Sequence, residues 1–574
     1  GQTIYDAGRN IAGWARVRVR GPEGARVLVE YCELPSDREL VPDIHPSKLK
    51  IRVEDTDYAS FYDKSINIRQ QNGYILKGKG TETFECRFAY MGFQFVRVTA
   101  DPGVTVERVE AVPVHTDVAE AGRFVCSNDV VNRLQDMSRA SLLNNFHSIP
   151  TDCPHREKQG WTADTYMTDQ AAIYNFDMAA FYAKWVEDLA GTQDSAGGLC
   201  TVAPSTGYDQ SISTVWPAAI VYVPWDLLAY YGDRRVVERH YETMMRFAES
   251  SLLRQRDGKP EIIGEVLGDW VSPHMTLSDT LMSYSMAPPE GLTLYGTASH
   301  YRVVRNLAEV ARFLGKRDDA VRLDAWADRI ARRFNEEFFD AASGIYHGEN
   351  PTPYRQAANV VPLEYGLVPE ADSARVLGSL LRDLDGTRDR IGTGFVGTLS
   401  MMELMPRIDP ERAYRLATQP DYPGWGFMAL SGATTMWETW DGSASRNHPP
   451  FCLISAYFYK YLAGIRCDRA YPGFERFTVD PSVVGDLTFV EAWHDSPYGR
   501  IRSEWRRDGS RLTMKVSVPV GTTATIGVPT RDAAGVAESG RPVSGTDGVK
   551  FLRAAGGKAF YEVGSGSYVF TSRL

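Results

Sequence analysis

The chain has 574 residues, of which 43% are hydrophobic and 24% charged, and its formal net charge is −10 at pH 7. This length is too great for one hydrophobic core and predicts two to four domains. The acidic balance and the lack of a basic stripe argue against a nucleic-acid partner. No run of 18 apolar residues could span a bilayer, so a soluble globular protein without a membrane partner is expected.

Seven cysteines are scattered along the chain without any CxxC spacing. This pattern fits neither a disulfide framework nor a zinc site. We expect free, mostly buried thiols in a reducing compartment, which favours the cytoplasm over the periplasm or secretion. The chain begins with Gly1, so a trimmed product is expected and the lack of a signal peptide carries no information.

The predicted elements fall into three blocks, and residues 1–117 form the first. Val17 and Val19 alternate with arginines, and Val27 and Val29 alternate again after a Gly-Pro-Glu-Gly turn. This period of two is typical of strands with one buried face. A β-sandwich domain is therefore predicted at the N-terminus.

Residues 118–465 show helical periodicity. Apolar side chains recur at three- and four-residue spacing from Val130, Met178, Tyr301, Leu323 and Ile454 onward. Ser127 or Asn128 is a plausible N-cap for the first of these helices. About a dozen helices are expected, and a closed double ring would bury them economically.

Residues 466–574 return to the strand pattern. The apolar residues from Leu512 to Val520 alternate after the Asp508-Gly509 turn, and the run from Ala524 to Val528 is expected to pair with them. A second β-sandwich is therefore predicted at the C-terminus.

The loops of the helical block contain the unusual residues. Thr151–Asp164 holds three carboxylates, basic side chains, a proline, a glycine and a tryptophan, and it leads into a helix expected to begin near Trp161. Tryptophan recurs near carboxylate or in Pro- and Gly-rich loops at Trp216, Trp225, Asp269-Trp270 and Trp437–Asp441. Sugars suit this pairing, because an apolar ring face stacks on indole while charged groups bind the hydroxyls.

Glycoside hydrolysis requires two carboxyl groups, one to protonate the leaving oxygen and one to activate water or attack carbon. Glu157 and Glu438 are the best pair, since each lies in a tryptophan-bearing loop. Asp152, Asp164 and Asp269 remain rival carboxylates, although turn or helix-start roles would also explain the first two.

Three competing signals are weak. The GxGxxG match from Gly392 to Gly397 has no preceding strand, so a dinucleotide site is not expected. Cys153 beside His155 is a poor nucleophile–base pair because neighbours in sequence rarely have that geometry. The histidines lack HExxH spacing, so neither a metal nor a cofactor is predicted; His448 is either a packed histidine or a ligand for sugar hydroxyls.

The segment Asp152–Trp161, with the sequence DCPHREKQGW, resembles the bacterial α-L-rhamnosidases of glycoside hydrolase family 78. The resemblance extends over essentially the whole chain. Its other landmarks follow in the family's order, namely Tyr5–Trp14, Gly268–Trp270, Gly392–Phe395, Trp437–Asp441, Ser445–His448 and Ser496–Ile501.

The resemblance implies an (α/α)6 barrel flanked by β-sandwiches, and an inverting mechanism in which Glu157 is the general acid and Glu438 the general base. Inversion predicts carboxyl groups about 6.5–9.5 Å apart. The resemblance and the tryptophan loops together give these candidate sugar-binding residues: Asp152, Arg156, Trp161, Asp164, Trp216, Asp269, Trp270, Trp437, Trp440 and His448.

The expected function is exo-acting α-L-rhamnosidase activity on a rhamnosylated small molecule or oligosaccharide. One alternative is another (α/α)6 enzyme on a related sugar, including a polysaccharide lyase. A lyase would need a Tyr or His base near an acidic sugar, which the tryptophan–glutamate loops fit less well. The other alternative is a non-catalytic carbohydrate-binding protein, which the presence of both Glu157 and Glu438 disfavours.

Overall fold

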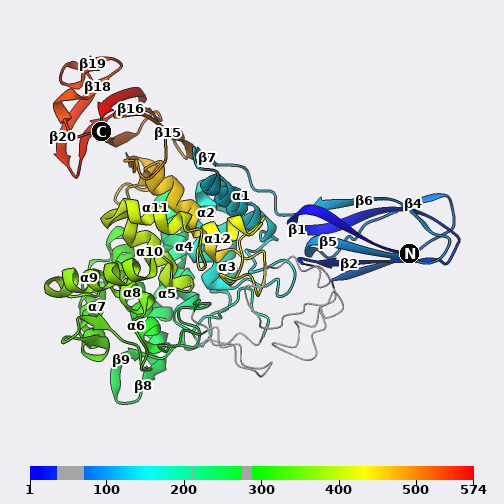
Figure 1. The fold of residues 1–574 in the computed structure, drawn as a ribbon. Helices are drawn as coiled ribbons and strands as arrows, with labels where there is room; N and C mark the ends of the chain where they lie inside the picture. The colour runs from blue at the N-terminus through cyan, green and yellow to red at the C-terminus, as the bar shows by residue number, and fades with distance from the viewer. Residues whose placement is uncertain (35–69, 208–212, 274–286) are drawn as a thin grey trace.

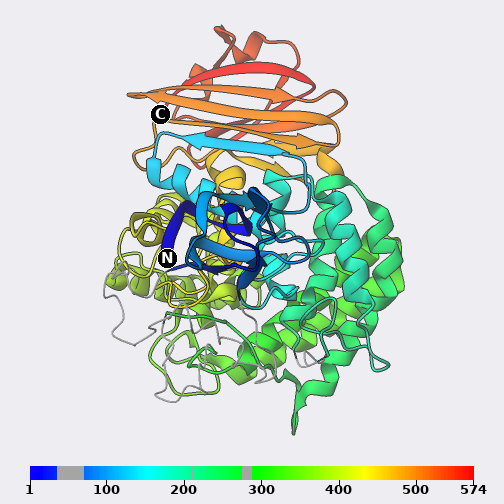
Figure 2. The same cartoon turned by 90° about the vertical axis from the view of Figure 1, so that its right-hand side faces the viewer.

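The structure is a computed structural model that describes residues 1–34, 70–207, 213–273 and 287–574. It has an N-terminal β domain, a central helical domain and a C-terminal β domain, in the predicted order (Figure 1). The N-terminal domain projects from one side of the helical domain, and the C-terminal domain packs on another (Figures 1 and 2).

The N-terminal domain is an antiparallel sheet that encloses its own core. Strand β1 bulges between Asp6 and Ile11, pairs first with β5, and then pairs with β4 and β6. Val17 and Val19 are buried while the intervening arginines face outward, as the alternation predicts. Among the described residues of this domain the strands are β1 (Gln2–Arg20), β2 (Arg26–Cys32), β3 (Gln71–Ile75), β4 (Thr81–Phe84), β5 (Met91–Ala100) and β6 (Thr105–Pro113).

In the described part of the central domain, six inner helices form a closed ring. Each contacts the next around the ring, and the last contacts the first. Two of them, Thr162–Asn175 and Ala219–Tyr231, are buried on nearly every side because neighbours cover them all round, and the second is apolar over almost its whole length. The inner helices are α2 (Thr162–Asn175), α4 (Ala219–Tyr231), α6 (Thr293–Phe313), α8 (Gln356–Tyr365), α10 (Phe395–Ile408) and α13 (Ile454–Tyr457), which η5 (Phe458–Leu462) extends.

The outer helices pack around this ring and are amphipathic. Helix α1 begins where expected, since the Asn128 side chain accepts hydrogen bonds from the backbone N–H groups of Val130 and Val131. The outer helices are α1 (Asp129–Asn144), α3 (Ala179–Ala190), α5 (Arg234–Ser250), α7 (Arg317–Phe338), α9 (Glu370–Thr387), α11 (Pro410–Thr418) and the short α12 (Trp425–Leu430). Two small hairpins extend from the loops and consist of β8 (Gln255–Arg256), β9 (Lys259–Ile263), β10 (Phe339–Asp340) and β11 (Ile345–Tyr346).

The two ends of the barrel differ in chemistry. A cavity of about 420 Å³ lies among the C-terminal halves of the inner helices, where Tyr174, Tyr230 and Glu403 contribute to its wall. The loops that carry Glu157 and Glu438 instead precede α2 and α13, at the N-terminal ends of the inner helices. The polar cavity is therefore separate from the predicted catalytic pair.

The C-terminal domain is a sandwich of two sheets. Buried residues such as Trp505, Met514, Ile526 and Phe570 fill the space between them. The larger sheet contains, in spatial order, β19 (Arg541–Pro542), β18 (Ala537–Glu538), β22 (Gly566–Arg573), β16 (Arg511–Val518), β15 (Gly499–Asp508), β14 (Phe489–Ser496) and β7 (Gly122–Cys126). The smaller sheet contains β12 (Ile465–Cys467), β13 (Arg476–Val479), β17 (Thr523–Pro529), β21 (Lys558–Val563) and β20 (Val549–Ala555).

Two details of the predicted C-terminal organisation differ in the structure. The expected pairing of the 512–520 and 524–528 strands is wrong, because β16 and β17 lie in different sheets and Val520 is 83% exposed. Pro519 follows the end of β16 and cannot donate a ladder hydrogen bond, which favours a crossover at this point. Strand β7, inside the range predicted as barrel, pairs with β14 of the larger sheet.

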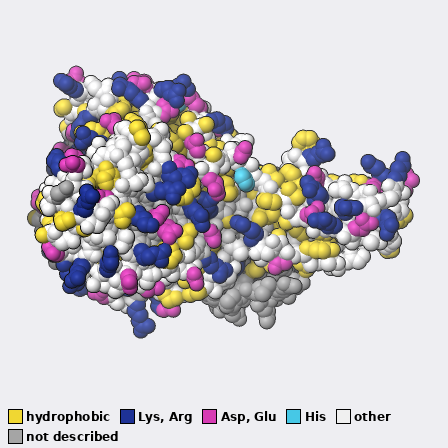
Figure 3. Space-filling model, turned by 90° about the horizontal axis from the view of Figure 1, so that it is seen from above, with side chains coloured by type: hydrophobic (Ala, Val, Ile, Leu, Met, Phe, Trp, Pro, Cys, Tyr) yellow, Lys and Arg dark blue, Asp and Glu magenta, His cyan; other side chains and the backbone are white. Residues whose placement is uncertain are grey.

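The surface seen from above mixes basic and acidic side chains over all three domains (Figure 3). On this face, no broad area of one charge is visible. Among the described residues, none of the helices combines the length and the apolar character that a bilayer span requires.

Candidate active site

The loop of residues 151–161 is held rigidly where it enters α2. Trp161 forms a β-bridge to Val202, and Gly160 packs so closely that an added Cβ would lie 2.1 Å from the Ala203 carbonyl oxygen. Helix α2 then begins at Thr162, as predicted. A side chain at position 160 would collide with the Ala203 carbonyl, so the loop requires glycine at this position.

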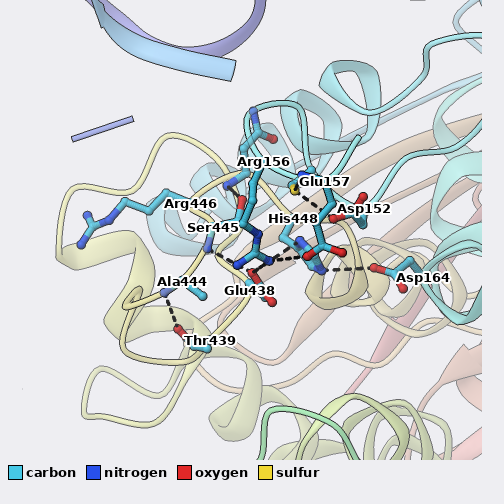
Figure 4. Close-up of polar contacts among 12 residues, drawn as sticks. Asp152, Arg156, Glu157, Asp164, Glu438, Thr439, Ala444, Ser445, Arg446 and His448 are labelled. Carbon is cyan, nitrogen blue, oxygen red and sulfur yellow. Dashed lines mark hydrogen bonds and ion pairs between the residues drawn. The ribbon is translucent and has the colours of Figure 1, made fainter. Parts of the chain in front are cut away.

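Glu157 and Glu438 meet at the guanidinium group of Arg156 (Figure 4). Arg156 Nη2 lies 2.6 Å from Glu157 Oε1 and 2.9 Å from Glu438 Oε2. The Trp161 indole N–H donates to the other Glu157 oxygen at 2.7 Å. The three charged side chains are at most 10% exposed. The barrel thus unites two carboxyl groups that are remote in sequence.

His448 connects Glu438 to a third carboxyl group. Its Nε2 lies 3.2 Å from Asp164 Oδ1, and its Nδ1 lies 3.9 Å from Glu438 Oε2. The Phe395 ring stacks on the imidazole, with 6.0 Å between centroids. Asp164 projects from the first turn of α2, so the helix start and the 434–448 loop together build this side of the site.

The Asp152 carboxylate forms hydrogen bonds within the loop of residues 151–161. Its Oδ1 accepts from the Gln159 backbone N–H at 2.8 Å, and the Cys153 thiol donates to its Oδ2 at 2.8 Å. Asp152, Cys153 and His448 offer potential metal-ligand atoms within 4.8 Å of one another. However, burial raises the pKa of the Cys153 thiol, which disfavours the thiolate that a metal would need. This arrangement fits a structural brace.

The remaining predicted residues divide between the site and its supports. Trp216 and Trp270 pack edge to face, with 6.5 Å between ring centroids, and the Trp270 carbonyl accepts from the Phe395 backbone N–H at 2.9 Å. Trp437 is nearly buried, and the Arg446 guanidinium lies 4.7 Å from its ring centroid. Trp270 is thereby linked to Phe395, whose ring stacks on His448.

Asp269 and Trp440 occupy supporting positions. Both Asp269 oxygens accept backbone hydrogen bonds, from Gly394 and Gly397 at the start of α10. Trp440 is buried against Trp425, and its N–H donates to the Thr393 carbonyl at 2.9 Å. The hydrogen bonds of these two side chains therefore go to the start of α10 and to the residue just before it.

Comparison with known families identifies this arrangement. Residues 119–462, more than half of the chain, match the family model of the bacterial alpha-L-rhamnosidase 6 hairpin glycosidase domain. Residues 1–115 match the bacterial alpha-L-rhamnosidase concanavalin-like domain, and residues 464–541 match the C-terminal domain of the same enzymes. The chain belongs to the bacterial α-L-rhamnosidase family.

Individual α-L-rhamnosidases are similar along the whole chain. One from Streptomyces avermitilis is 30% identical and covers 100% of this chain, which covers 52% of that protein. The structure from Dictyoglumus thermophilum has 31% identity and a TM-score of 0.86, covering 100% of this chain and 62% of that one. The S. avermitilis structure, a complex with L-rhamnose, has 28% identity and a TM-score of 0.83, with coverage of 100% and 52%. The chain spans about half the length of the curated relatives it matches.

Charge pairing in this rhamnosidase-family site opposes the effect of burial. Burial by itself would raise the pKa of Glu438, but Arg156 and His448 more than offset it and lower that pKa. Burial would likewise lower the pKa of His448, but Glu438 and Asp164 raise it to about 9. Glu438 is therefore an ionised carboxylate beside a cationic histidine at neutral pH.

Replacement of His448 by Asn is expected to move the acidic limb of the activity profile. Loss of the imidazolium removes a group that lowers the Glu438 pKa, so Glu438 should protonate at higher pH. Because its pKa is raised, charged His448 also contributes to the free energy of unfolding of the parent protein. This contribution should be complete below about pH 6.5 and should be lost as the pH rises through about 9. The measurement is kcat/KM against pH.

His494→Asn is the matched control for this substitution. His494 is a buried histidine of the C-terminal sheet, where it packs against Tyr174. An acidic limb that stays in place in His448→Asn, or that moves equally in both variants, would contradict the assignment of His448.

Two residues at the site, Ser445 and Phe395, were not among the individually predicted site residues. The Ser445 backbone N–H donates to Glu438 Oε2 at 3.1 Å, and Phe395 supplies the ring against His448. Both belong to motifs that the sequence offers, Ser445–His448 and Gly392–Phe395. Their roles depend on a backbone donor and on a ring contact, neither of which residue type indicates.

Proposed function

We propose that the chain hydrolyses terminal, non-reducing α-L-rhamnose from glycosides or oligosaccharides, with inversion at the anomeric carbon. The meeting of Glu157 and Glu438 at Arg156 is the observation that carries this proposal. The relatives named α-L-rhamnosidase, one of them solved with L-rhamnose, support the choice of sugar.

In this mechanism Glu157 protonates the glycosidic oxygen as its bond to the anomeric carbon breaks. Glu438 accepts a proton from the water that attacks that carbon from the opposite face. The lowered pKa of Glu438 suits a base that must be ionised before the reaction. In this proposal Asp164 and His448, which contact each other beside the pair, bind sugar hydroxyls.

Arg156 also implies a rearrangement during binding. Its contacts with the two glutamates are 2.6 and 2.9 Å long, so their nearest oxygens lie closer together than the separation of about 6.5–9.5 Å for inverting enzymes. The proposed inverting mechanism therefore predicts that Arg156 releases at least one of the carboxylates when the sugar and the water bind.

Proton NMR of the first product formed from an aryl α-L-rhamnoside tests the proposal. The expected initial product is β-L-rhamnose, before mutarotation mixes the anomers. Initial release of α-L-rhamnose would overturn inversion while leaving rhamnosidase activity in place. No cleavage of α-L-rhamnosides by the folded protein would overturn the proposed function itself.

A further inference from the structure

We propose that Glu33 in the N-terminal domain is a positioning residue that holds both catalytic loops in register. This inference rests on the proposed function, because it assigns Glu33 a part in the same reaction. Glu33 follows β2, and its side chain is 8% exposed. It lies outside the helical block that carries Glu157 and Glu438.

Glu33 contacts the two loops directly. Its Oε2 accepts from the Arg446 backbone N–H at 2.8 Å and lies 3.6 Å from His155 Nδ1. Its other oxygen accepts from the Asn10 side-chain amide at 2.9 Å. One carboxylate of the N-terminal domain thus lies between the loop of the predicted acid and the loop of the predicted base.

Each contact is one residue from the catalytic cluster. Ser445, which precedes Arg446, donates its N–H to Glu438 Oε2 at 3.1 Å and accepts from the Glu438 N–H at 2.8 Å. His155 precedes Arg156, the side chain that contacts both glutamates. A shift of either loop at Glu33 would therefore move the groups that surround the reaction centre.

The hydrogen bond that Glu33 accepts from Arg446 comes from the backbone N–H, while the guanidinium of Arg446 interacts with Glu33 through its charge alone. The Arg446 guanidinium lies over the Trp437 ring, and Figure 4 shows this side chain extending away from the two glutamates. A hydrogen bond from a buried backbone N–H to a carboxylate is stronger than one between neutral groups. Glu33 thereby fixes the course of the main chain next to Ser445.

The N-terminal domain remains docked by contacts that do not involve Glu33. The Asn10 N–H donates to Thr434 Oγ1 at 2.9 Å, and the Ala12 N–H donates to Asn144 Oδ1 at 3.1 Å. Gly92 packs so tightly that an added Cβ would lie 2.6 Å from the backbone nitrogen of His155. Removal of the Glu33 carboxylate should loosen the loops without detaching the domain.

The test compares Glu33→Ala and Glu33→Gln with a control from the same strand. Glu30 of β2 forms a partly buried pair with Arg97, at 2.7 Å, and Glu30→Ala removes this pair, which involves neither loop. We expect Glu33→Ala to lower kcat on an aryl α-L-rhamnoside by about 10- to 100-fold, since small misplacements of catalytic groups have effects of this size. KM should change less than kcat.

Glu33→Gln should retain intermediate activity, because its single side-chain oxygen can still accept from Arg446. Glu30→Ala should keep the parent kcat even if its thermal midpoint falls. The acidic limb of the kcat profile should move to higher pH in Glu33→Ala, by a smaller amount in Glu33→Gln, and not in Glu30→Ala, because the Ser445 hydrogen bond helps to lower the Glu438 pKa. The other ionisable groups around Glu438 are Arg156, Glu157, Asp164, His155 and His448.

Parent-like kcat and an unmoved limb in Glu33→Ala would overturn the positioning role. The same fall in kcat for Glu30→Ala would also overturn it, since the effect would then follow general weakening of the domain. If Glu33→Ala does not fold, Glu33→Gln decides by the same two measurements. Failure of the parent protein to cleave any α-L-rhamnoside would instead reject the proposed function.

Discussion

Glu438→Gln is expected to lower the turnover of an aryl α-L-rhamnoside by at least about 10²-fold, the usual scale of general acid–base catalysis. The amide cannot accept the proton of the attacking water, while its size preserves the packing of the loop. Glu438 is 3% exposed and accepts from Arg156 and from the Ser445 N–H, so its replacement acts on an ordered site. The measurement is kcat under saturating substrate, with circular dichroism to confirm the fold.

Asp441→Asn serves as the matched control in the same loop. Asp441 accepts from the Ser443 N–H at 3.0 Å and from the Ser443 hydroxyl at 2.7 Å, so it stabilises the turn without contact with the pair.

Azide requires no base, and it should restore turnover to Glu438→Ala with formation of the β-rhamnosyl azide. Parent-like turnover of Glu438→Gln would remove Glu438 from the role of base.

Glu157→Gln is expected to show a loss that depends on the leaving group. The leaving group of an alkyl α-L-rhamnoside is a strongly basic alkoxide unless its oxygen is protonated as the bond breaks. Hydrolysis of this substrate should therefore fall by at least about 10²-fold. A nitrophenyl α-L-rhamnoside has an acidic leaving group and should lose much less. The ratio of kcat/KM for the two substrates, compared between variant and parent, measures the contribution of the acid.

Lys158→Gln is the control for Glu157 in its own loop. The Lys158 ammonium turns toward Tyr90 of the N-terminal domain, where it donates to the Tyr90 carbonyl. This variant should leave the substrate ratio unchanged. An equal loss on both substrates in Glu157→Gln would show that Glu157 does not protonate the leaving group.

The sequence allows the order of the domains and the catalytic cluster to be predicted for physical reasons. Long apolar periodicities depend on local geometry, so the β, helical and β blocks follow from spacing. Arg156, Glu157 and Asp164 lie within one short segment, and the barrel brings Glu438 and His448 to the same segment. The tryptophan-bearing loops pointed to the pairing of Glu157 with Glu438, and the resemblance to family 78 enzymes assigned their roles.

Other features depend on contacts that local patterns do not encode. Strands β16 and β17 have the alternation of a hairpin, but tertiary packing places them in opposite sheets. The sequence does not indicate that Asp269 accepts from the Gly394 backbone at the start of α10 or that the Trp440 indole donates to the Thr393 carbonyl. Glu33 is an isolated acid after a strand, and its partner Arg446 lies 413 residues away.

The pairing of β7 with β14 has a consequence for assembly of the chain. Gly122–Cys126 precedes the whole barrel, and Phe489–Ser496 follows it, so their hydrogen bonds close the helical domain into one large loop. During synthesis β7 must await a partner that emerges only after the last barrel helix. A fragment beginning at residue 466 would leave β14 as an uncovered sheet edge, a template for association between copies. The C-terminal sandwich and the barrel are therefore expected to mature as one folding unit, and truncation between them should yield aggregation-prone protein.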